Sequence, residues 1–362
     1  MLFAASAFGI TLGAAQSTDD LPSAPSAANQ PKAAPVKPPP SAPRHQPEQQ
    51  PDPTAASPSA SSQPSLPTEA KSTQGTPDTE TIEEGGTTIR RTVNEVSVVF
   101  TVMDKHNRYV KDLERTDFRV LDDQRPVEEI RSFRKETDLP LLVGLLIDAS
   151  NSIRDRFKFE QESAIEFLNQ TIRRHYDTAF VIGFDVQAEL TQDFTDDTDA
   201  LAQGVRMLHP GGGTALYDAL YFACRDKLLK SPQSNSVRRA IILVSDGEDN
   251  SSHVTREESI EMAIRANVIV YTISTNFPGG GAGDKVLERI ADATGGRAFH
   301  PFQLSEVANA FAEIQDDLRS QYELSYRPAN FVHDGRYRTI AITAVHKGLK
   351  VRSRGGYYAP VQ

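Results

Sequence analysis

The sequence of 362 residues predicts an α/β fold, in which a doubly wound, mostly parallel sheet is flanked by a small β-sandwich-like module from both chain ends. Three observations lead to this prediction. Residues 141–148 (LLVGLLID) and 238–246 (RRAIILVSD) are largely apolar runs that end at an aspartate, which is typical of central parallel strands buried on both faces. Helical and strand-like segments alternate between about 140 and 320. Between about 94 and 136, and again beyond about 320, the pattern is strand-like alone.

The elements of the central region follow one another at short intervals. Thr255 and Glu258 have the spacing of a capping box and mark the start of one helix, and Gly295 with Gly296 marks the end of another. In chain order we expect a helix over 153–174, strands over 178–185 and 188–194, helices over 198–208 and 215–230, a helix from Thr255, a strand over 268–275, a helix ending at Gly295, a short strand over 297–300 and a helix over 303–320.

The two flanks each contain strand-like segments separated by turns. EVSVVFTVMD, DFRVLDD and VEEIRSFRKE precede the central region, and YELSYRP, YRTIAITAVH and LKVRSRGGYYAP follow it. Neither flank has enough strands for a core of its own, so we expect them to pair with each other. The expected domains are a β-module formed by residues 88–139 and 321–362, and an α/β domain over 140–320.

The first part of the chain has a different composition. Residues 2–15 form an apolar run that ends in small residues, as in a secretory signal peptide, although no Lys or Arg precedes it. We therefore expect a signal-peptide-like segment over 1–16 and export to the periplasm or beyond. Residues 17–80 hold 15 of the 23 prolines, which predicts a disordered Pro/Ala/Ser-rich linker over 17–87. Whether it is a stalk or a solubilising tail stays open.

Charge and cysteine content narrow the possible functions. The formal net charge of -10 argues against a nucleic-acid-binding surface. The single cysteine, Cys224, cannot form an internal disulfide and is expected to be a small buried residue in a helix. An acidic cluster in a polar loop is expected to be solvated, with a second metal site as the alternative; it consists of Asp193, Asp196, Asp197 and Asp199.

Five oxygen-bearing side chains stand at positions where loops should converge. The carboxyl ends of neighbouring parallel strands meet at one edge of a sheet, so the two strand-ending aspartates can share a site. The serines alternate with the first aspartate, and the threonine follows a run of three glycines. Such hard oxygen donors suit Mg²⁺ or Mn²⁺. The predicted metal ligands are Asp148, Ser150, Ser152, Thr214 and Asp246.

The alternative for two of these residues is helix capping. Ser152 could be the N-cap of the helix expected from Ile153, and Thr214 could cap the helix expected from Ala215.

The pattern DxSxS, then Thr, then Asp resembles the metal-ion-dependent adhesion site of the von Willebrand factor type A domain, which has a Rossmann-like fold. Residues 88–358, including the closing GGYYAP, are similar to VWFA-related proteins known largely from acidobacteria. The resemblance implies that Ser150, Ser152 and Thr214 are hydroxyl ligands, and that Asp148 and Asp246 bind directly or through water. It also implies that an Asp or Glu of a partner protein completes the metal shell, and that the last helix moves on ligation.

The predicted function is a metal-dependent protein-binding, adhesion-type module without catalytic residues. A metal-assisted hydrolase, with Asp148 or Ser150 as nucleophile, is one alternative. Its helpers are few: His209 stands beside a glycine turn, and Glu248 and Asp249 are expected on an exposed loop. A scaffold whose ion only stabilises the fold is the other alternative.

Overall fold

The fold is that of a computed structural model, which describes residues 79–84, 87–92, 95–136, 139–231, 237–276, 280–329 and 331–361. The signal-peptide-like segment and most of the expected linker therefore lie outside the described residues. At the end of that linker, Thr79–Glu84 (β1) pairs antiparallel with Thr87–Thr92 (β2). The β-branched residues on either side of a Gly-Gly pair favour this hairpin.

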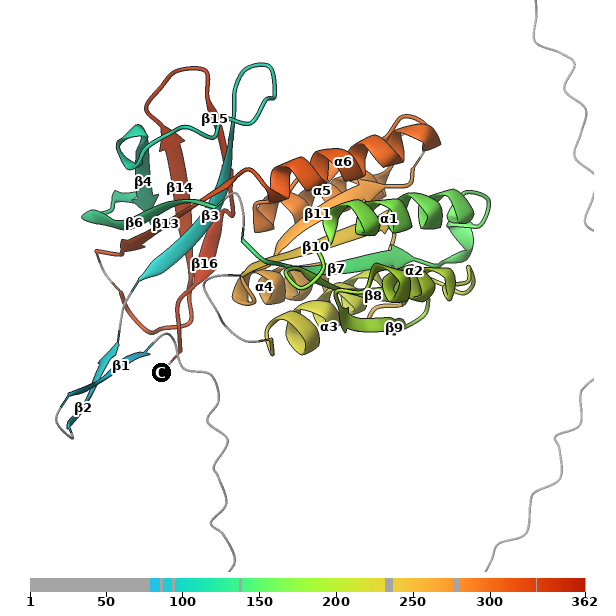
Figure 1. Ribbon diagram of the computed structural model, residues 1–362, viewed down its shortest axis with the longest axis horizontal. Coiled ribbons are helices and arrows are strands. Elements are labelled where there is room, and N and C mark those ends of the chain that lie inside the picture. Colours follow the sequence, from blue (N-terminus) through green and yellow to red (C-terminus); the bar gives the residue numbers. More distant parts are fainter. Residues whose placement is uncertain are drawn as a thin grey trace, which may run out of the picture. The chain divides into compact units, whose positions relative to one another are not determined.

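The central unit contains a six-stranded sheet with the strand order β12-β11-β10-β7-β8-β9 (Figure 1). All neighbours pair in parallel except β9, which is antiparallel to β8. β7 and β10 lie in the middle because they are largely apolar on both faces, and the expected doubly wound, mostly parallel sheet is confirmed. The strands are Leu141–Asp148 (β7), Thr178–Phe184 (β8), Ala188–Thr195 (β9), Arg238–Ser245 (β10), Ile269–Ser274 (β11) and Ala298–Phe299 (β12).

Helices cover both faces of this sheet. Val143 and Leu145 of β7 pack in one core with α1, α2 and α6, while Leu146 packs in a second core with α3, α4 and α5. None of the described helices is long and apolar enough to cross a membrane. The helices are Phe157–Thr171 (α1), Thr198–Arg206 (α2), Leu216–Phe222 (α3), Arg256–Arg265 (α4), Ala282–Thr294 (α5) and Val307–Leu318 (α6).

Three helices differ from the expected bounds. A 3-10 turn, Asn151–Ile153, precedes α1, which begins four residues later than expected. A second 3-10 turn, Leu304–Glu306, precedes α6. The helix expected over 215–230 continues beyond α3 as a π-helical turn, Ala223–Leu228, which contains the buried Cys224. The capping box at the start of α4 is present as predicted.

The flanks pair into two antiparallel sheets around a shared apolar core, as expected. Their strand orders are β15-β3-β13-β6 and β16-β14-β4-β5. Each sheet contains strands from both sides of the α/β unit, so neither flank forms a core alone. We call these two sheets the β-module. Its strands are Val96–Met103 (β3), Phe118–Asp122 (β4), Arg125–Pro126 (β5), Glu129–Glu136 (β6), Gln321–Arg327 (β13), Tyr337–Ala344 (β14), Lys350–Ser353 (β15) and Gly356–Tyr358 (β16).

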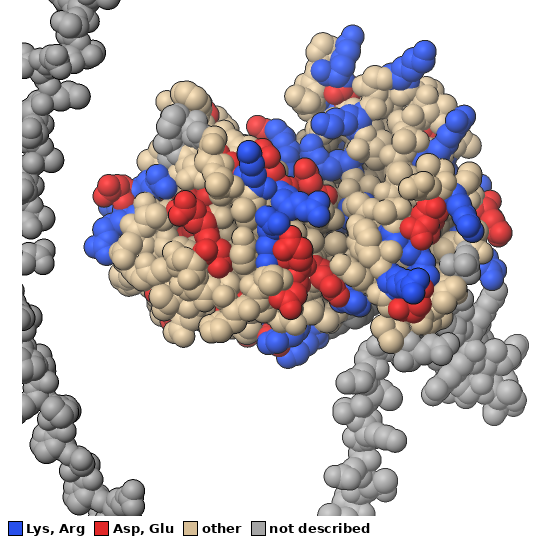
Figure 2. Space-filling model, turned by 180° about the vertical axis from the view of Figure 1, so that it is seen from behind, with Lys and Arg blue, Asp and Glu red and all other residues tan. Residues whose placement is uncertain are grey.

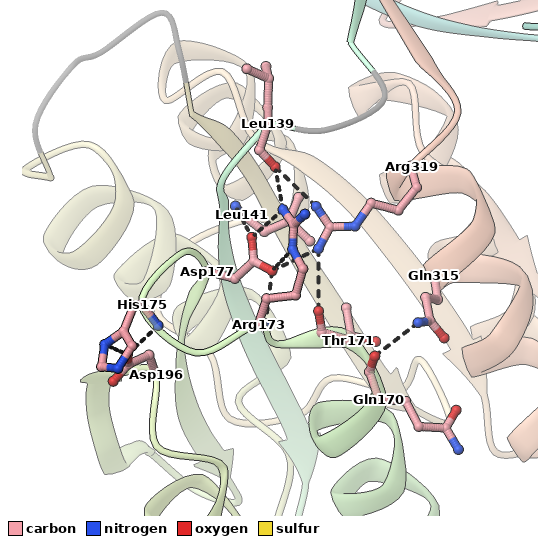
Figure 3. A network of polar contacts seen from close by, with 10 residues as sticks. All are labelled: Leu139, Leu141, Gln170, Thr171, Arg173, His175, Asp177, Asp196, Gln315 and Arg319. Atoms are coloured by element: carbon pink, nitrogen blue, oxygen red, sulfur yellow. Dashed lines mark hydrogen bonds and ion pairs between the residues drawn. The ribbon is translucent and has the colours of Figure 1, made fainter.

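A buried carboxylate fastens the end of α6 to the sheet where the chain passes into β13 (Figure 3). Asp177 is fully buried and accepts hydrogen bonds from Arg319 Nη2 at 2.7 Å and Arg173 Nε at 2.9 Å. It also accepts one from the backbone N–H of Leu141 at 2.8 Å. Burial opposes ionisation of Asp177, but these hydrogen bonds outweigh it and lower its pKa. We call these four residues the Asp177 clasp.

Candidate metal centre

The two strand-ending aspartates lie at the carboxyl ends of adjacent strands. β7 and β10 pair in parallel with Ile147 beside Val244, so the residues that follow come together. Asp148 is fully buried, and Asp246 is 5% exposed. In a doubly wound sheet, the connections from two neighbouring central strands run to opposite faces of the sheet. This leaves a crevice outside the carboxyl ends of those strands, which loops can line.

A continuous chain of hydrogen bonds links the DxSxS segment to Asp246. The backbone N–H of Ser150 donates to Asp148 Oδ1 at 2.9 Å. The hydroxyls of Ser150 and Ser152 lie 2.9 Å apart, and Ser152 Oγ donates to Asp246 Oδ2 at 2.7 Å. The structure thus brings four of the five predicted residues together.

The loop that carries Thr214 lies against the same segments. Gly211 N donates to Ala149 O at 2.7 Å, and Asn250 Oδ1 accepts a hydrogen bond from Thr214 N at 2.9 Å. A Cβ added to Gly213 would lie 2.5 Å from that same Asn250 oxygen, so the loop approaches this closely only because Gly213 has no side chain. Thr214 is 4% exposed. The loop that carries the fifth predicted residue therefore contacts the DxSxS segment through its backbone.

The electrostatics of this site favour a cation. Burial raises the pKa of Asp148 to about 6, and repulsion from Asp246 adds to the shift, although hydrogen bonds from Ser245 and Ser150 oppose it. Two buried carboxylates repel each other, and a divalent ion would offset this repulsion. The donors are carboxylate and hydroxyl oxygens, which fit Mg²⁺ or Mn²⁺. Among the described residues no group of three or more His, Cys, Asp or Glu side chains could hold a metal. The candidate site differs from such groups because it combines two carboxylates with three hydroxyl side chains.

The capping alternatives do not describe Ser152 and Thr214. The residue at the N-cap of α1 is Arg156, and the residue at the N-cap of α3 is Ala215; neither makes a side-chain capping bond. Ser152 instead uses its hydroxyl to bond Asp246. The late start of α1 has the same cause, because the DxSxS turn is held by contacts to a different strand.

Two of the three residues considered as catalytic helpers, His209 and Asp249, form local hydrogen bonds. His209 Nδ1 lies 2.7 Å from the backbone oxygen of Met207 in an exposed loop. Asp249 accepts hydrogen bonds from Tyr217 N and from Ser252 Oγ. Glu248 is exposed, and its backbone N–H rather than its carboxylate contacts Asp246.

The acidic cluster has local structural partners. Asp197 is the N-cap of α2 and accepts from Asp199 N, while Asp196 accepts from His175 N (Figure 3). Asp193 forms an ion pair with Lys227 at 2.6 Å. The predicted loop placement is wrong for Asp193, which lies in β9, and for Asp199, which lies in α2. The contacts fit the structural interpretation of these carboxylates.

Three supporting residues escaped the sequence analysis. Ser245 Oγ donates to Asp148 Oδ2 at 2.7 Å, and Asn250 fixes the Thr214 loop. Asn276 Nδ2 donates to the backbone oxygen of Asp246 at 2.7 Å and to Asp284 Oδ1 at 3.1 Å. Ser245 could have been noticed beside Asp246, but no sequence signal points to Asn276, which reaches the site from the end of the next strand.

Figure 2 shows Lys and Arg side chains interspersed with Asp and Glu over the face that it displays.

Comparison with known proteins finds a match to a domain family in the central region. Residues 143–248 match the von Willebrand factor type A domain family. The calcium-activated chloride channel regulator 1 of Bos taurus is 32% identical over 180 residues, which are 48% of this chain and 19% of the bovine protein. The chain thus spans about a fifth of the length of this curated relative.

Several solved structures are similar over about half of the chain. Proximal thread matrix protein 1 from the mussel byssus is 16% identical with a TM-score of 0.45, covering 54% of this chain and 50% of its own. A further structure of that protein, with a TM-score of 0.44, has a zinc-occupied metal-ion-dependent adhesion site (MIDAS) motif. The vWF domain of the type V pili tip protein Mfa5 from Porphyromonas gingivalis is 17% identical with a TM-score of 0.41, covering 50% of this chain and 95% of its own.

Proposed function

We propose that the von Willebrand factor type A domain in this chain is a metal-dependent protein-binding module of the adhesion type. The observation that carries the proposal is the hydrogen-bonded chain from Ser150 through Ser152 to Asp246, beside the buried Asp148. This arrangement places hard oxygen donors from two strand ends side by side, and none of these side chains caps a helix.

Each of the five residues has a role in this proposal. Asp148 and Asp246 supply the negative charge, and the hydroxyls of Ser150, Ser152 and Thr214 supply neutral oxygens. Ser245, through its bond to Asp148, fixes the orientation of one carboxylate. A bound Mg²⁺ or Mn²⁺ would offer one further coordination position, which we propose is filled by an Asp or Glu carboxylate of a partner protein. No catalytic residue is part of the proposal.

We propose an exported location, periplasmic or extracellular, for this module. The support is the apolar run over residues 2–15, followed by a proline-rich stretch suited to hold a domain away from an anchor.

Metal binding is tested by thermal unfolding of the full chain with Mg²⁺, with Mn²⁺ and with EDTA. An ion at about a hundred times its dissociation constant stabilises the native state by ~2.7 kcal/mol. We expect the unfolding temperature of the wild type to rise with either ion, and the rise to disappear in Asp148→Ala. The matched control is Asp155→Ala, which removes an exposed aspartate seven residues further along the chain and should respond like the wild type.

The role of the ion is tested separately from its presence. Peptides that contain a single Asp or Glu, selected on the Mg²⁺-loaded protein, should lose binding in EDTA and when that acid becomes Asn or Gln. Binding that persists in EDTA, together with a normal metal-dependent shift in unfolding temperature, would favour an ion that only stabilises the fold.

A further inference from the structure

Glu160 is an acidic residue on the buried face of α1. It lies three residues after Phe157 and four before Ala164, and both of these apolar residues belong to the core that α1 forms with the sheet. The same core contains Ile147, which precedes Asp148 at the end of β7. The side chain of Glu160 is 1% exposed. A carboxyl group thus stands where the spacing of α1 favours an apolar side chain.

The surroundings of this carboxyl group do little to stabilise a negative charge. Neither oxygen of Glu160 accepts a hydrogen bond from the described residues. Arg156 forms an ion pair with it, but Nε lies 3.6 Å from Oε1, which is too long for a hydrogen bond. A buried carboxylate without hydrogen bonds is costly, so the group tends to keep its proton instead.

Two acids at the ends of the central strands also act on Glu160. Burial is the main reason that its pKa rises to about 8, and the charges of Asp148 and Asp246 add to the shift. Arg156 acts in the opposite direction. Among the described residues, no charged side chain of α2 or α6, the helices beside α1, contributes to the shift. At neutral pH the metal-free protein therefore holds a proton on Glu160.

Ionisation of Glu160 becomes easier once a divalent cation occupies the candidate metal centre. The positive charge offsets those of Asp148 and Asp246, which removes the repulsion that opposes a carboxylate at Glu160. The effect needs no direct contact between Glu160 and the ion, because charges interact strongly through a buried region of low dielectric constant. Groups outside the direct ligand shell commonly change the affinity of a metal site.

We propose that Glu160 links metal binding to proton release: binding of a divalent cation at Asp148 and Asp246 expels the proton of Glu160 to the solvent. The inference rests on the proposed function, because it requires that the site bind an ion. In such a linkage the ion and the proton compete, so acid weakens ion binding and alkali strengthens it. Partner binding that depends on the ion then weakens as pH falls through the neutral range.

Calorimetry with the full chain measures the released proton directly. Mg²⁺ and, separately, Mn²⁺ are titrated at pH 7.5 in buffers that differ in ionisation enthalpy, and the change of the binding heat with the buffer gives the number of protons released per ion. A fall of about one unit in the pKa of Glu160 on ion binding releases about half a proton at this pH. We expect this release in the wild type and its loss in Glu160→Gln, which cannot ionise.

The matched control is Glu162→Gln, which changes an exposed glutamate of the same helix and should release as many protons as the wild type. Comparing the wild type with Glu160→Gln also separates Glu160 from Asp148, whose raised pKa makes it a second source of protons. An equal release in these two proteins overturns the inference and leaves the metal centre in place. If none of the three proteins binds either ion, the metal centre is overturned as well.

Two measurements on the wild type do not depend on a variant folding. The dissociation constant for Mg²⁺ should fall about fivefold between pH 6.5 and pH 8.5. In protein with ¹³C-labelled glutamate side chains, one carboxyl signal should titrate near pH 8 without metal, and Mg²⁺ should lower that midpoint by about one unit. A set of glutamate signals with no midpoint above pH 7, or one that Mg²⁺ leaves unchanged, contradicts the inference.

Discussion

Glu160 of α1 is a fully buried glutamate near the candidate metal centre. Its side chain is 1% exposed, and neither carboxyl oxygen accepts a hydrogen bond from the described residues. Arg156 Nε lies 3.6 Å from Oε1. Burial raises the pKa of Glu160 to about 8; Arg156 opposes the shift, and repulsion from Asp148 and Asp246 adds to it.

This residue predicts a pH dependence of stability in the metal-free protein. Between about pH 5 and pH 8 native Glu160 keeps a proton that the unfolded chain, with an ordinary pKa near 4.5, has lost. The unfolded state therefore binds fewer protons, and the free energy of unfolding should fall as pH rises, by up to about 1.4 kcal/mol per pH unit from this group. Urea unfolding in EDTA across this range measures the slope.

Glu160→Gln should flatten the slope and make the protein more stable at pH 8. The matched control is Glu162→Gln, which changes an exposed glutamate of the same helix and should leave the slope as it is. Equal slopes in the wild type and Glu160→Gln would show that Glu160 ionises normally.

For single residues, the sequence predicts the oxygen donors of the candidate metal centre but not the residues that contact and position them. Asp148, Ser150 and Ser152 follow one strand within five residues, so local pattern is enough to group them. Asn276 and Glu160 take part through contacts made only after the chain has folded. Glu160 looks in sequence like any polar residue on a helix, and periodicity does not tell which single polar residue is buried.

At the scale of elements, the Asp177 clasp holds Arg319, the residue that follows α6. The resemblance in the sequence implies that the last helix moves on ligation. The clasp joins the turn after α6 to the start of β7 and to the end of α1. A shift of α6 along its axis would therefore have to break the contact between Arg319 and Asp177.

Asp177→Asn should destabilise the protein by about 1.5–3 kcal/mol, because the buried carboxylate loses its charge-assisted hydrogen bonds while the two arginine side chains stay partly exposed to solvent. Urea unfolding gives the free energy, and hydrogen exchange should show the largest loss of protection in α6. Asp316→Asn, at an exposed position of α6, is the control and should change stability by less than about 0.5 kcal/mol. A similar small effect for Asp177→Asn would mean that the clasp contributes little.

Elements were predictable where the pattern was long and regular, as in β7, β10 and the capping box of α4. The start of α1 was not, because Ser152 bonds to Asp246, 94 positions away, instead of to its own helix. The π-helical turn after α3 has the same apolar spacing as an α-helix and could not be told from one.

At the scale of the whole molecule, the β-module needs both ends of the chain. β3 pairs with β13 on one side and with β15 on the other, and both partners come from the C-terminal flank. Val98, Phe100 and Val102 of β3 are buried by this arrangement. The sequence predicts this pairing by elimination, since neither flank has strands enough alone, but it does not give the strand order.

Deletion of residues 321–362 should therefore unfold the β-module. Burial of one Phe or Val side chain stabilises by about 1.5–3 kcal/mol, so exposing three of them removes much of a typical stability of about 5–15 kcal/mol. We expect aggregation in size-exclusion chromatography and loss of β-structure by circular dichroism. The control is deletion of residues 1–94, which keeps β3 to β6 and β13 to β16 and should leave the unfolding temperature unchanged. If the protein without residues 321–362 were monomeric and stable, the expectation would be wrong.

The antiparallel pairing of β3 with β13 also sets how the molecule would respond to tension. The chain enters β3 at Val96, beside Tyr326, and the α/β unit connects to β13 at Gln321, beside Thr101. A pull between the N-terminal segment and a partner held at the metal centre would thus act on opposite ends of one ladder. The two strands would be drawn past each other in shear. Their hydrogen bonds would then be strained all at once and not opened one by one, and a small sheet resists force well in this geometry.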